Sequence, residues 1–349
     1  MYKRIGLSRY SFMHQKIKYF FFICISLFVG LFVSCSETDE LISDTKVTPQ
    51  VIFLFSPGGL GDMSYNDCIL EGVQKFKRSY PEVDFFIYSP TAMEEADRIF
   101  SDWMKRPGSN IPVVFALASS DFEALVDKYL PIYGLTDNKR ILLFESNKIY
   151  DNPKVSTFHV TMYGASFLAG AMARQLIGAQ RSLILLGSSS DVTIEAAKDG
   201  FAEGFGGSDY DVEYLADDWT GYVMANVAYQ KMSEWTSTYG YIFPVAGGSN
   251  TGLYRYTREY PDSPYLAGMD IDQSDLSNKI TGSVVKRFDI LVEEYFTEWL
   301  HTGEMPVAMT YGLDSGYVDW KLAPLYEEEF RDLTEQLRGT AIVKEHEYY

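Results

Sequence analysis

The sequence predicts an α/β protein of two Rossmann-like lobes, each built on a parallel sheet, joined at a hinge. Three observations predict it. The 349 residues are too many for one ordinary core and suit two lobes. Strand-like apolar runs alternate with helix-like amphipathic runs from residue 51 onward, which indicates a parallel sheet covered by helices on both faces. The series then restarts near residue 165 without a long low-complexity linker.

The elements follow in order along each series. The first series predicts strands at 51–55, 84–89, 111–118, 140–146 and 155–161, with helices at 67–80, 94–106 and 121–134. The second begins with a helix rich in small residues at 165–178. It continues with strands at 182–188, 211–216, 241–248 and 265–270, and helices at 194–205 and 221–235. Segment 285–303 is a predicted helix of lobe one, and the acidic amphipathic tail 326–339 is a predicted helix on lobe two.

The chain is expected to cross between lobes near Phe158, return near Lys286 and cross again near Tyr311. The predicted domains follow from these crossings. Lobe one comprises 51–157 plus 286–310, and lobe two comprises 158–285 plus 311–349.

The first 34 residues are predicted to be a secretory signal peptide. Five Lys or Arg and no acid precede the 15-residue apolar run Tyr19–Val33, which is shorter than a membrane-spanning helix. "FVSC" then resembles a bacterial lipobox and predicts that Cys35 is acylated; the alternative is a cysteine near a cleavage site by chance. The acidic tether 35–50 would hold the domain off a membrane, which places the protein outside the cytoplasm, lipid-anchored at the periplasmic or outer-membrane surface of the cell envelope.

Net charge and cysteine content argue against several kinds of binding partner and site. Loss of residues 1–34 removes five positive charges and no negative ones, so the net charge falls from −18 to −23. Such a domain repels nucleic acid and anionic lipid. The expected ligand is neutral or cationic, or anionic and held by a few local donors. Cys68 would be the sole remaining thiol, so no internal disulfide is expected, and a packing role is favoured over a nucleophile.

The glycine-rich loop "SPGGLGDMSYND" between the first strand and helix resembles a phosphate loop only superficially. A dinucleotide fingerprint would need a third glycine where Ser64 stands, and no lysine follows as in a P-loop. Asp62 at the helix entrance would also repel phosphate. The loop instead presents Asp62, Tyr65 and Asn66. The alternatives are that Asp62 only caps the helix and Tyr65 only packs against it.

Other strand ends carry polar or aromatic residues, where ligands of open α/β sheets bind. Gly247 and Gly248 follow one strand, Asp270 follows another, and Lys286 ends a β-like run. Trp219 lies in a further loop. The structural alternatives are an ordinary turn at Gly247 and Gly248, a surface position for Lys286 and a packing role for Trp219. A calcium loop at 270 is discounted, because its sixth position lacks glycine and its twelfth lacks an acid. No metal site and no cofactor are expected.

The order of these segments resembles the basic membrane protein family. The segments are "GGLGDMSYNDCILEGV", "FHVTMYGASFLAGAMA", "GFAEGFGG", "VAGGSNTGLY", "AGMDIDQ", "TGSVVKRFD" and "YGLDSGYVDW", from about Val51 to Trp320. Members are lipoprotein substrate-binding proteins of ABC transporters, and the best understood bind purine nucleosides. The resemblance implies a type I periplasmic-binding-protein fold, a permease partner and no enzymatic turnover. The protein is expected to be a monomer.

The resemblance also implies a role for each candidate residue. Tyr65 would stack on one face of a purine while Asp62 and Asn66 hydrogen-bond the base, and Trp219 is similar in place to the aromatic that covers the other face. The residues similar in place to those that hold or border the ribose are Asp270, Lys286, Gly247 and Gly248.

The sequence departs from the family pattern in the first loop. Gly61 stands where the family has Asn, and Asp67 where Gln is common, so base preference stays open.

Two other classes are kept as alternatives. The first is a protein of the same fold that binds a sugar or another small ligand, either for transport or as a sensor for a membrane kinase. Its binding site would use the same residue types. A nucleoside hydrolase would need a base or metal to activate water. It is disfavoured because the three histidines after the signal are widely spaced and no Asp-rich metal motif stands at the first strand.

Overall fold

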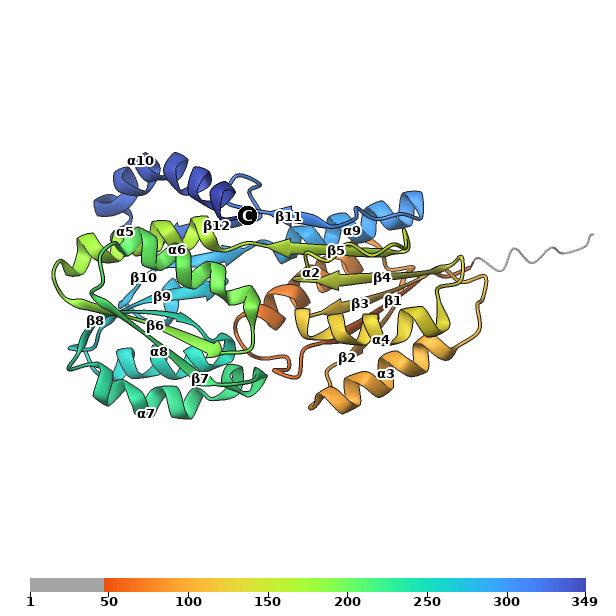
Figure 1. Ribbon diagram of the computed structural model, residues 1–349, viewed down its shortest axis with the longest axis horizontal. Coiled ribbons are helices and arrows are strands. Elements are labelled where there is room, and N and C mark those ends of the chain that lie inside the picture. Colours follow the sequence, from red (N-terminus) through yellow and green to blue (C-terminus); the bar gives the residue numbers. More distant parts are fainter. Residues whose placement is uncertain (1–46) are drawn as a thin grey trace, which may run out of the picture. The chain divides into compact units, whose positions relative to one another are not determined.

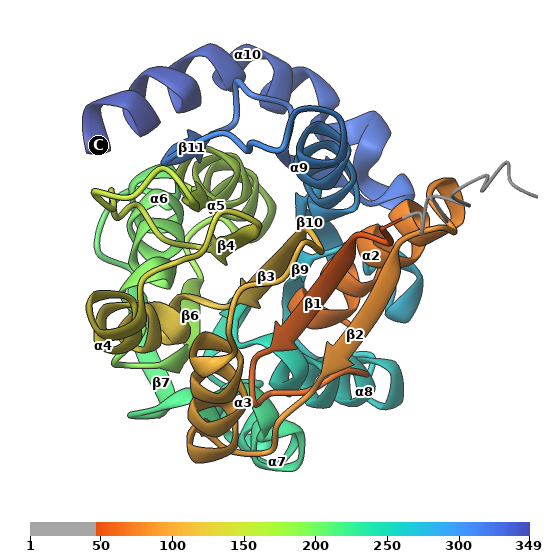
Figure 2. The ribbon, with the colours of Figure 1, turned by 90° about the vertical axis from the view of Figure 1, so that its right-hand side faces the viewer.

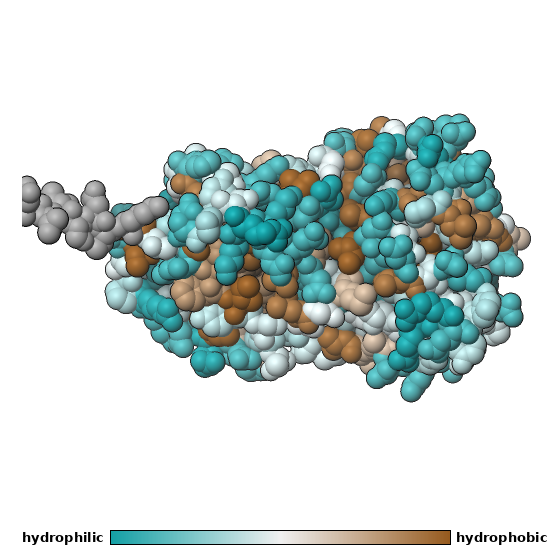
Figure 3. All heavy atoms as spheres, turned by 180° about the vertical axis from the view of Figure 1, so that it is seen from behind, coloured by the Kyte–Doolittle hydropathy of each residue, from teal (hydrophilic) through white to brown (hydrophobic). Residues whose placement is uncertain are grey.

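Two six-stranded sheets are built from the two series of strands and helices (Figure 1). The structure is a computed structural model that describes residues 47–349. The predicted signal peptide and Cys35 lie outside the described residues. Within the described part, no helix combines the length and the apolar character needed to span a membrane. The face in Figure 3 is mostly hydrophilic with scattered hydrophobic patches.

The first sheet has the strand order β11-β5-β4-β3-β1-β2, and every pair is parallel. Its strands are β1 (Gln50–Phe55), β2 (Asp84–Tyr88), β3 (Val113–Ala118), β4 (Lys139–Phe144), β5 (Val155–Val160) and β11 (Met309–Tyr311). Its helices are α2 (Tyr65–Ser79), α3 (Met93–Lys105), α4 (Glu123–Tyr133) and α9 (Phe288–Thr302). Figure 2 shows α2 and α9 on one side of this sheet and α3 and α4 on the other.

Strand β1 explains why the sheet is covered on both faces. Successive side chains of a strand point to opposite faces. Phe53 and Phe55 pack in one buried cluster with residues of α2 and α9. Ile52 and Leu54 pack in a second cluster with residues of α3 and α4. A continuous apolar run is therefore needed here, as is typical of a parallel strand buried on both sides.

The second sheet has the order β12-β10-β9-β8-β6-β7, with only β12 antiparallel to its neighbour. Its strands are β6 (Arg181–Ser188), β7 (Tyr210–Ala216), β8 (Tyr239–Val245), β9 (Tyr265–Asp270), β10 (Ile280–Lys286) and β12 (Val318–Leu322). The accompanying helices are α5 (Tyr163–Ile177), α6 (Glu195–Phe205), α7 (Ala225–Trp235), α8 (Asn250–Glu259) and α10 (Pro324–Tyr348).

The small residues of α5 and α6 let these two helices pack closely. A Cβ atom on Gly170 of α5 would lie 2.2 Å from the carbonyl oxygen of Phe201. A Cβ atom on Gly200 of α6 would lie 2.2 Å from the carbonyl oxygen of Tyr163. Real Cβ atoms do not approach backbone so closely, so glycine is required at both positions.

The α/β architecture with two parallel-dominated sheets confirms the predicted fold class. The predicted strands and helices are present, with the following differences. Helix α8 and the short strands β11 and β12 were not predicted. Helix α7 begins only after a 3-10 turn at Trp219–Val223. Helix α9 begins at Phe288, because Lys286 ends β10, and α10 extends to Tyr348.

The chain passes between the two sheets at three places, which we call the crossovers. They lie between β5 and α5, between β10 and α9, and between β11 and β12. Phe158 pairs within the first sheet and Lys286 within the second, each close to a predicted boundary. The division into two lobes at these boundaries stays a prediction.

Candidate functional site

A pocket opens where strands of both sheets end. It has a volume of about 100 Å³ and is lined by residues that follow or end β1, β3, β4, β5, β6, β7, β8, β9 and β10. The eight ligand-binding residues proposed from the sequence all line this pocket: Asp62, Tyr65, Asn66, Trp219, Gly247, Gly248, Asp270 and Lys286. Carboxyl ends of parallel strands meet at one edge of a sheet, and here two such edges face each other.

The first loop is organised around the carboxylate of Asp62. Its Oδ1 accepts from the backbone amides of Ser64 at 2.9 Å and Asp67 at 3.1 Å. Its Oδ2 accepts from the amide of Asn66 at 2.9 Å and from Asn66 Nδ2 at 3.1 Å. Burial raises the pKa of Asp62, while these backbone donors act to lower it. The capping role considered from the sequence is therefore present, in a side chain that also lines the pocket.

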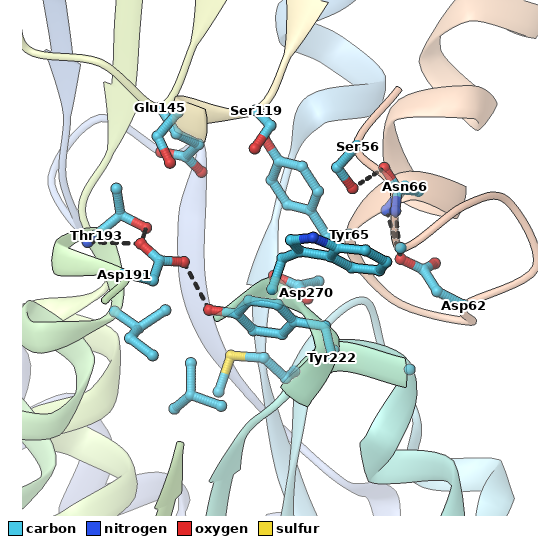
Figure 4. A pocket seen from close by; sticks show the side chains of 18 of the residues that line it. Ser56, Asp62, Tyr65, Asn66, Ser119, Glu145, Asp191, Thr193, Tyr222 and Asp270 are labelled. Carbon is cyan, nitrogen blue, oxygen red and sulfur yellow. Dashed lines mark hydrogen bonds between the residues drawn. The ribbon is translucent and has the colours of Figure 1, made fainter. Parts of the chain in front are cut away.

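Hydrogen bonds fix the side chain of Asn66, whereas ring contacts position the side chain of Tyr65. Asn66 Oδ1 accepts from Ser56 Oγ at 3.1 Å, so both ends of its amide are fixed (Figure 4). The Tyr65 ring meets Phe288 edge-on at a centroid distance of 5.2 Å. The ammonium of Lys286 lies 5.4 Å from the Tyr65 ring centroid. The Tyr65 hydroxyl is buried and has no hydrogen-bond partner among the described residues.

A buried ion pair forms part of the pocket lining. Lys286 Nζ donates to Glu145 Oε1 at 2.6 Å, and both side chains are about 5% exposed. Burial acts to raise the pKa of Glu145, but the charge of Lys286 and the nearby His159 lower it to about 2. Burial acts to lower the pKa of Lys286, but Glu145 and Asp270 raise it. Both groups are ionised at neutral pH.

Asp270 joins the two halves of the site. It ends β9 with a positive φ of 66°, and its Oδ2 accepts a hydrogen bond from Ser64 Oγ of the first loop. Burial raises the pKa of Asp270, and the charge of Lys286 opposes that shift.

A third group of polar residues comes from loops after β3, β6 and β7. Tyr222 donates its hydroxyl to Asp191 Oδ2 at 2.6 Å (Figure 4). Asp191 Oδ1 accepts from the amide of Thr193 at 2.9 Å and from its hydroxyl at 2.6 Å. Burial and the charge of Asp191 raise the pKa of Asp121. With Asp62, Glu145 and Asp270, the described lining holds five carboxylates and one ammonium.

The aromatic and glycine residues complete the wall. Trp219 is half-buried and begins the 3-10 turn that also carries Tyr222. Gly247 has a φ of 51°, and a Cβ atom there would lie 3.2 Å from the Tyr222 ring. A Cβ atom on Gly248 would lie 3.4 Å from Asp62 Cβ, so the two halves of the pocket approach closely at this point.

The sequence matches the family described as "ABC transporter substrate-binding protein PnrA-like" over residues 49–347. The chain belongs to this Bmp family. No curated protein matches the sequence.

Solved structures of low sequence identity share the fold of this Bmp-family protein. A solute-binding protein of an ABC transporter system from Aeropyrum pernix K1 has a TM-score of 0.66 at 16% identity, covering 86% of each chain. A transcriptional activator of the comK gene from Bacillus halodurans has a TM-score of 0.63 at 16% identity, covering 84% of this chain and 97% of that one. A sugar-binding protein of a sugar ABC transporter from Bacillus halodurans has a TM-score of 0.56 at 15% identity, covering 80% and 99%.

Family membership makes this protein an extracytoplasmic substrate-binding component of an ABC transporter, with a small-molecule ligand and a permease partner. Within residues 47–349, no group of three or more His, Cys, Asp or Glu could hold a metal ion.

Among the titratable residues that line the pocket of this Bmp-family protein, sequence reasoning missed four: Glu145, Asp121, Asp191 and Tyr222. Glu145 lies at the end of the predicted strand at 140–146 and directly follows β4, so the rule that strand ends line the cleft could have found it. Tyr222 lies three residues after Trp219, inside a segment that was predicted to be a regular helix.

Proposed function

We propose that this Bmp-family protein captures a purine nucleoside, or a closely related small molecule, for ABC-type uptake. One observation supports this most: a single pocket brings together two aromatic side chains, Tyr65 and Trp219, with Asp62, Asn66 and Asp270. Aromatic faces suit a flat ring system, and carboxylates suit ring N–H groups and hydroxyls.

The charge of the pocket supports a nucleoside over a nucleotide. Its one lining ammonium, Lys286, is already paired with Glu145, and four further carboxylates stand in the described lining. A phosphate group would meet net negative charge there. Lys286 would still have donors left for a ribose hydroxyl, because an ammonium has three.

Isothermal titration calorimetry of the purified protein tests this proposal. The protein is unfolded and refolded first, since a ligand carried through purification would mask the site. We expect one-to-one binding of at least one of inosine, guanosine and adenosine, weaker binding of cytidine, and none of inosine monophosphate. Asp270→Ala should abolish the heat, and Asp272→Ala, outside the pocket lining, should leave it unchanged. Absence of heat with every nucleoside would overturn the nucleoside assignment.

Sugar binding is the second candidate, because structural neighbours include proteins described as a sugar-binding protein and a glucose-galactose binding protein. Thermal shifts with glucose, galactose and arabinose, measured beside the nucleosides, separate the two. A nucleoside hydrolase would release free base from inosine, so chromatography of an incubated sample distinguishes binding from turnover.

We also propose that lipid on Cys35 anchors the protein at the cell envelope. The support is the lipobox-like "FVSC" followed by the tether 35–50. Mass spectrometry of protein from the membrane fraction should find a diacylglyceryl-modified cysteine. Cys35→Ser should lack this modification and leave the membrane fraction, and equal membrane retention of both would contradict the anchor.

A further inference from the structure

The C-terminal end of α10 lies against two crossovers and contacts them through one buried carboxylate. Glu345 is 1% exposed. Its Oε1 accepts from the amide of Gly164 at 2.8 Å, and its Oε2 accepts from the amide of Leu313 at 2.7 Å. Gly164 lies at the start of α5, just after the first crossover, and Leu313 lies in the third crossover. One side chain therefore joins two chain segments that connect the sheets.

The backbone around Glu345 is fitted to it. A Cβ atom on Gly312 would lie 2.3 Å from Glu345 Oε2, and one on Gly164 would lie 3.2 Å from Oε1. The same crossovers are joined directly by a 3.0 Å hydrogen bond from the amide of Thr161 to the carbonyl oxygen of Tyr311. A buried carboxylate is costly unless donors satisfy it, and here one amide at the start of α5 and one in the third crossover do so.

The last residue of the chain makes a second connection, which leads into the pocket. The Tyr349 hydroxyl lies 3.4 Å from His159 Nε2. His159 Nδ1 lies 3.0 Å from Glu145 Oε2. Glu145 lines the pocket and pairs with Lys286 at the end of β10, where the second crossover begins. In Figure 1 the C-terminus lies beside β11 and β12, between the two sheets.

Hydrogen bonds across the cleft, such as that from Gln273 Nε2 to the Met63 carbonyl oxygen, hold the loop after β9 against the loop after β1, and we take this arrangement as the closed one. Opening of such a cleft requires changes in backbone angles at the crossovers. A group that binds two crossovers at once restricts those changes.

We propose that Glu345 is a positioning residue for ligand binding: it braces the first and third crossovers in the arrangement that closes the pocket. This inference rests on the proposed function only in requiring that the protein bind a ligand by closure. It does not depend on which ligand that is.

The first test needs no ligand. Spin labels are placed through Ile132→Cys on α4 and Arg258→Cys on α8, two exposed positions associated with different sheets. Pulsed electron–electron double resonance then reports the distance between the two spin labels. Glu345→Ala should lengthen and broaden the distance distribution. Glu347→Ala, which removes the same charge from an exposed side chain of the same helix, should not.

Hydrogen exchange provides a local readout. The amides of Gly164 and Leu313 should exchange at least tenfold faster in Glu345→Ala and at the wild-type rate in Glu347→Ala. Glu345→Gln keeps an acceptor oxygen for one amide only, so it should give an intermediate change in both measurements. This variant also serves if Glu345→Ala does not fold.

The second test uses inosine as the probe. Glu345→Ala should bind inosine about tenfold more weakly than wild type, mainly through faster dissociation, because less of the protein occupies the closed arrangement. If wild type does not bind inosine, the nucleoside assignment fails while the distance measurement still decides the brace. A Glu345→Ala protein with the wild-type distance distribution and only a lower melting temperature would overturn the proposal.

Discussion

Gln273 Nε2 donates a 2.7 Å hydrogen bond to the carbonyl oxygen of Met63, which lies 210 residues earlier in the chain. The bond connects the loop after β9 to the loop after β1, so it spans the two sheets. The other end of the same amide accepts from the amide of Met269 at 3.0 Å and from the Tyr254 hydroxyl. Gln273 thus fixes one loop and reaches across to the other.

Gln273→Glu should weaken inosine binding about tenfold. It keeps an acceptor for Met269 but loses the donor to Met63 and sets two oxygens against each other, which disfavours the closed pocket. Titration calorimetry measures the change. Gln230→Glu on the exposed face of α7 introduces the same charge and should bind as wild type does. Equal affinity of Gln273→Glu and wild type would show that this bond does not support closure.

Glu145→Gln should lower the free energy of unfolding by about 3–5 kcal/mol, because it leaves the buried ammonium of Lys286 without a charged partner. Urea unfolding followed by circular dichroism measures this. The double variant with Lys286→Met should regain part of the loss. Asp127→Asn, which breaks the exposed pair with Lys148, should cost less than about 1 kcal/mol. A Glu145→Gln cost no larger than that of Asp127→Asn would contradict the prediction.

Acid should destabilise the protein through the same carboxylate. The pKa of Glu145 is lowered to about 2 in the folded protein, whereas an unfolded glutamate titrates near ~4.3. The stability from ionised Glu145 is therefore fully present above the unfolded pKa and is lost as the pH falls from there toward 2. Urea midpoints measured between pH 6 and pH 3 should fall less steeply for Glu145→Gln than for wild type, and parallel slopes would count against this assignment.

Tyr65→Phe should be at least as stable as wild type and bind inosine within about twofold, because the buried hydroxyl has no partner among the described residues. Tyr65→Ala should lose most binding, since the ring that would stack on the ligand is gone. Thermal unfolding and calorimetry on both variants check this. A large loss of affinity in Tyr65→Phe would mean that the hydroxyl contacts the ligand.

Nucleoside binding should quench tryptophan fluorescence through Trp219. The other tryptophans, Trp103, Trp235, Trp299 and Trp320, are at most 4% exposed, and none lines the pocket. Quenching by inosine should therefore disappear in Trp219→Phe and persist in Trp235→Phe. If inosine still quenched the fluorescence of Trp219→Phe, Trp219 would not be the second stacking residue. Tyr222, another aromatic residue of the pocket lining, would then be the next candidate.

Much of the fold was predictable because burial leaves a direct pattern. The run Val51–Phe55 is apolar throughout since both faces of β1 are covered, and such runs mark most strands of both sheets. Strands β11 and β12 were missed because they are short, at three and five residues, and lie at sheet edges where fewer apolar residues are needed. Helix α8 was missed because its residues include few aliphatic side chains.

The candidate site was predictable where a residue ends a strand or lies in the loop that follows one. Asp62, Asp270 and Lys286 were found in this way and by family resemblance, and all line the pocket. Their partners were not predictable. The donors to Asp62 lie within five residues of it, but the partner of Lys286 is Glu145, 141 residues away.

The sequence by itself determined the alternation of strands and helices, the strand-end loops that line a cleft, and the acidic balance that disfavours phosphate ligands. These depend on local periodicity and composition, which a chain carries along its length. Only the tertiary structure decided that Glu145 and Lys286 form a buried pair, that Tyr222 joins Trp219 on the wall, and that Glu345 binds two crossovers. Each of these depends on the relative placement of elements distant in sequence, which is set by how the sheets, helices and crossovers pack together.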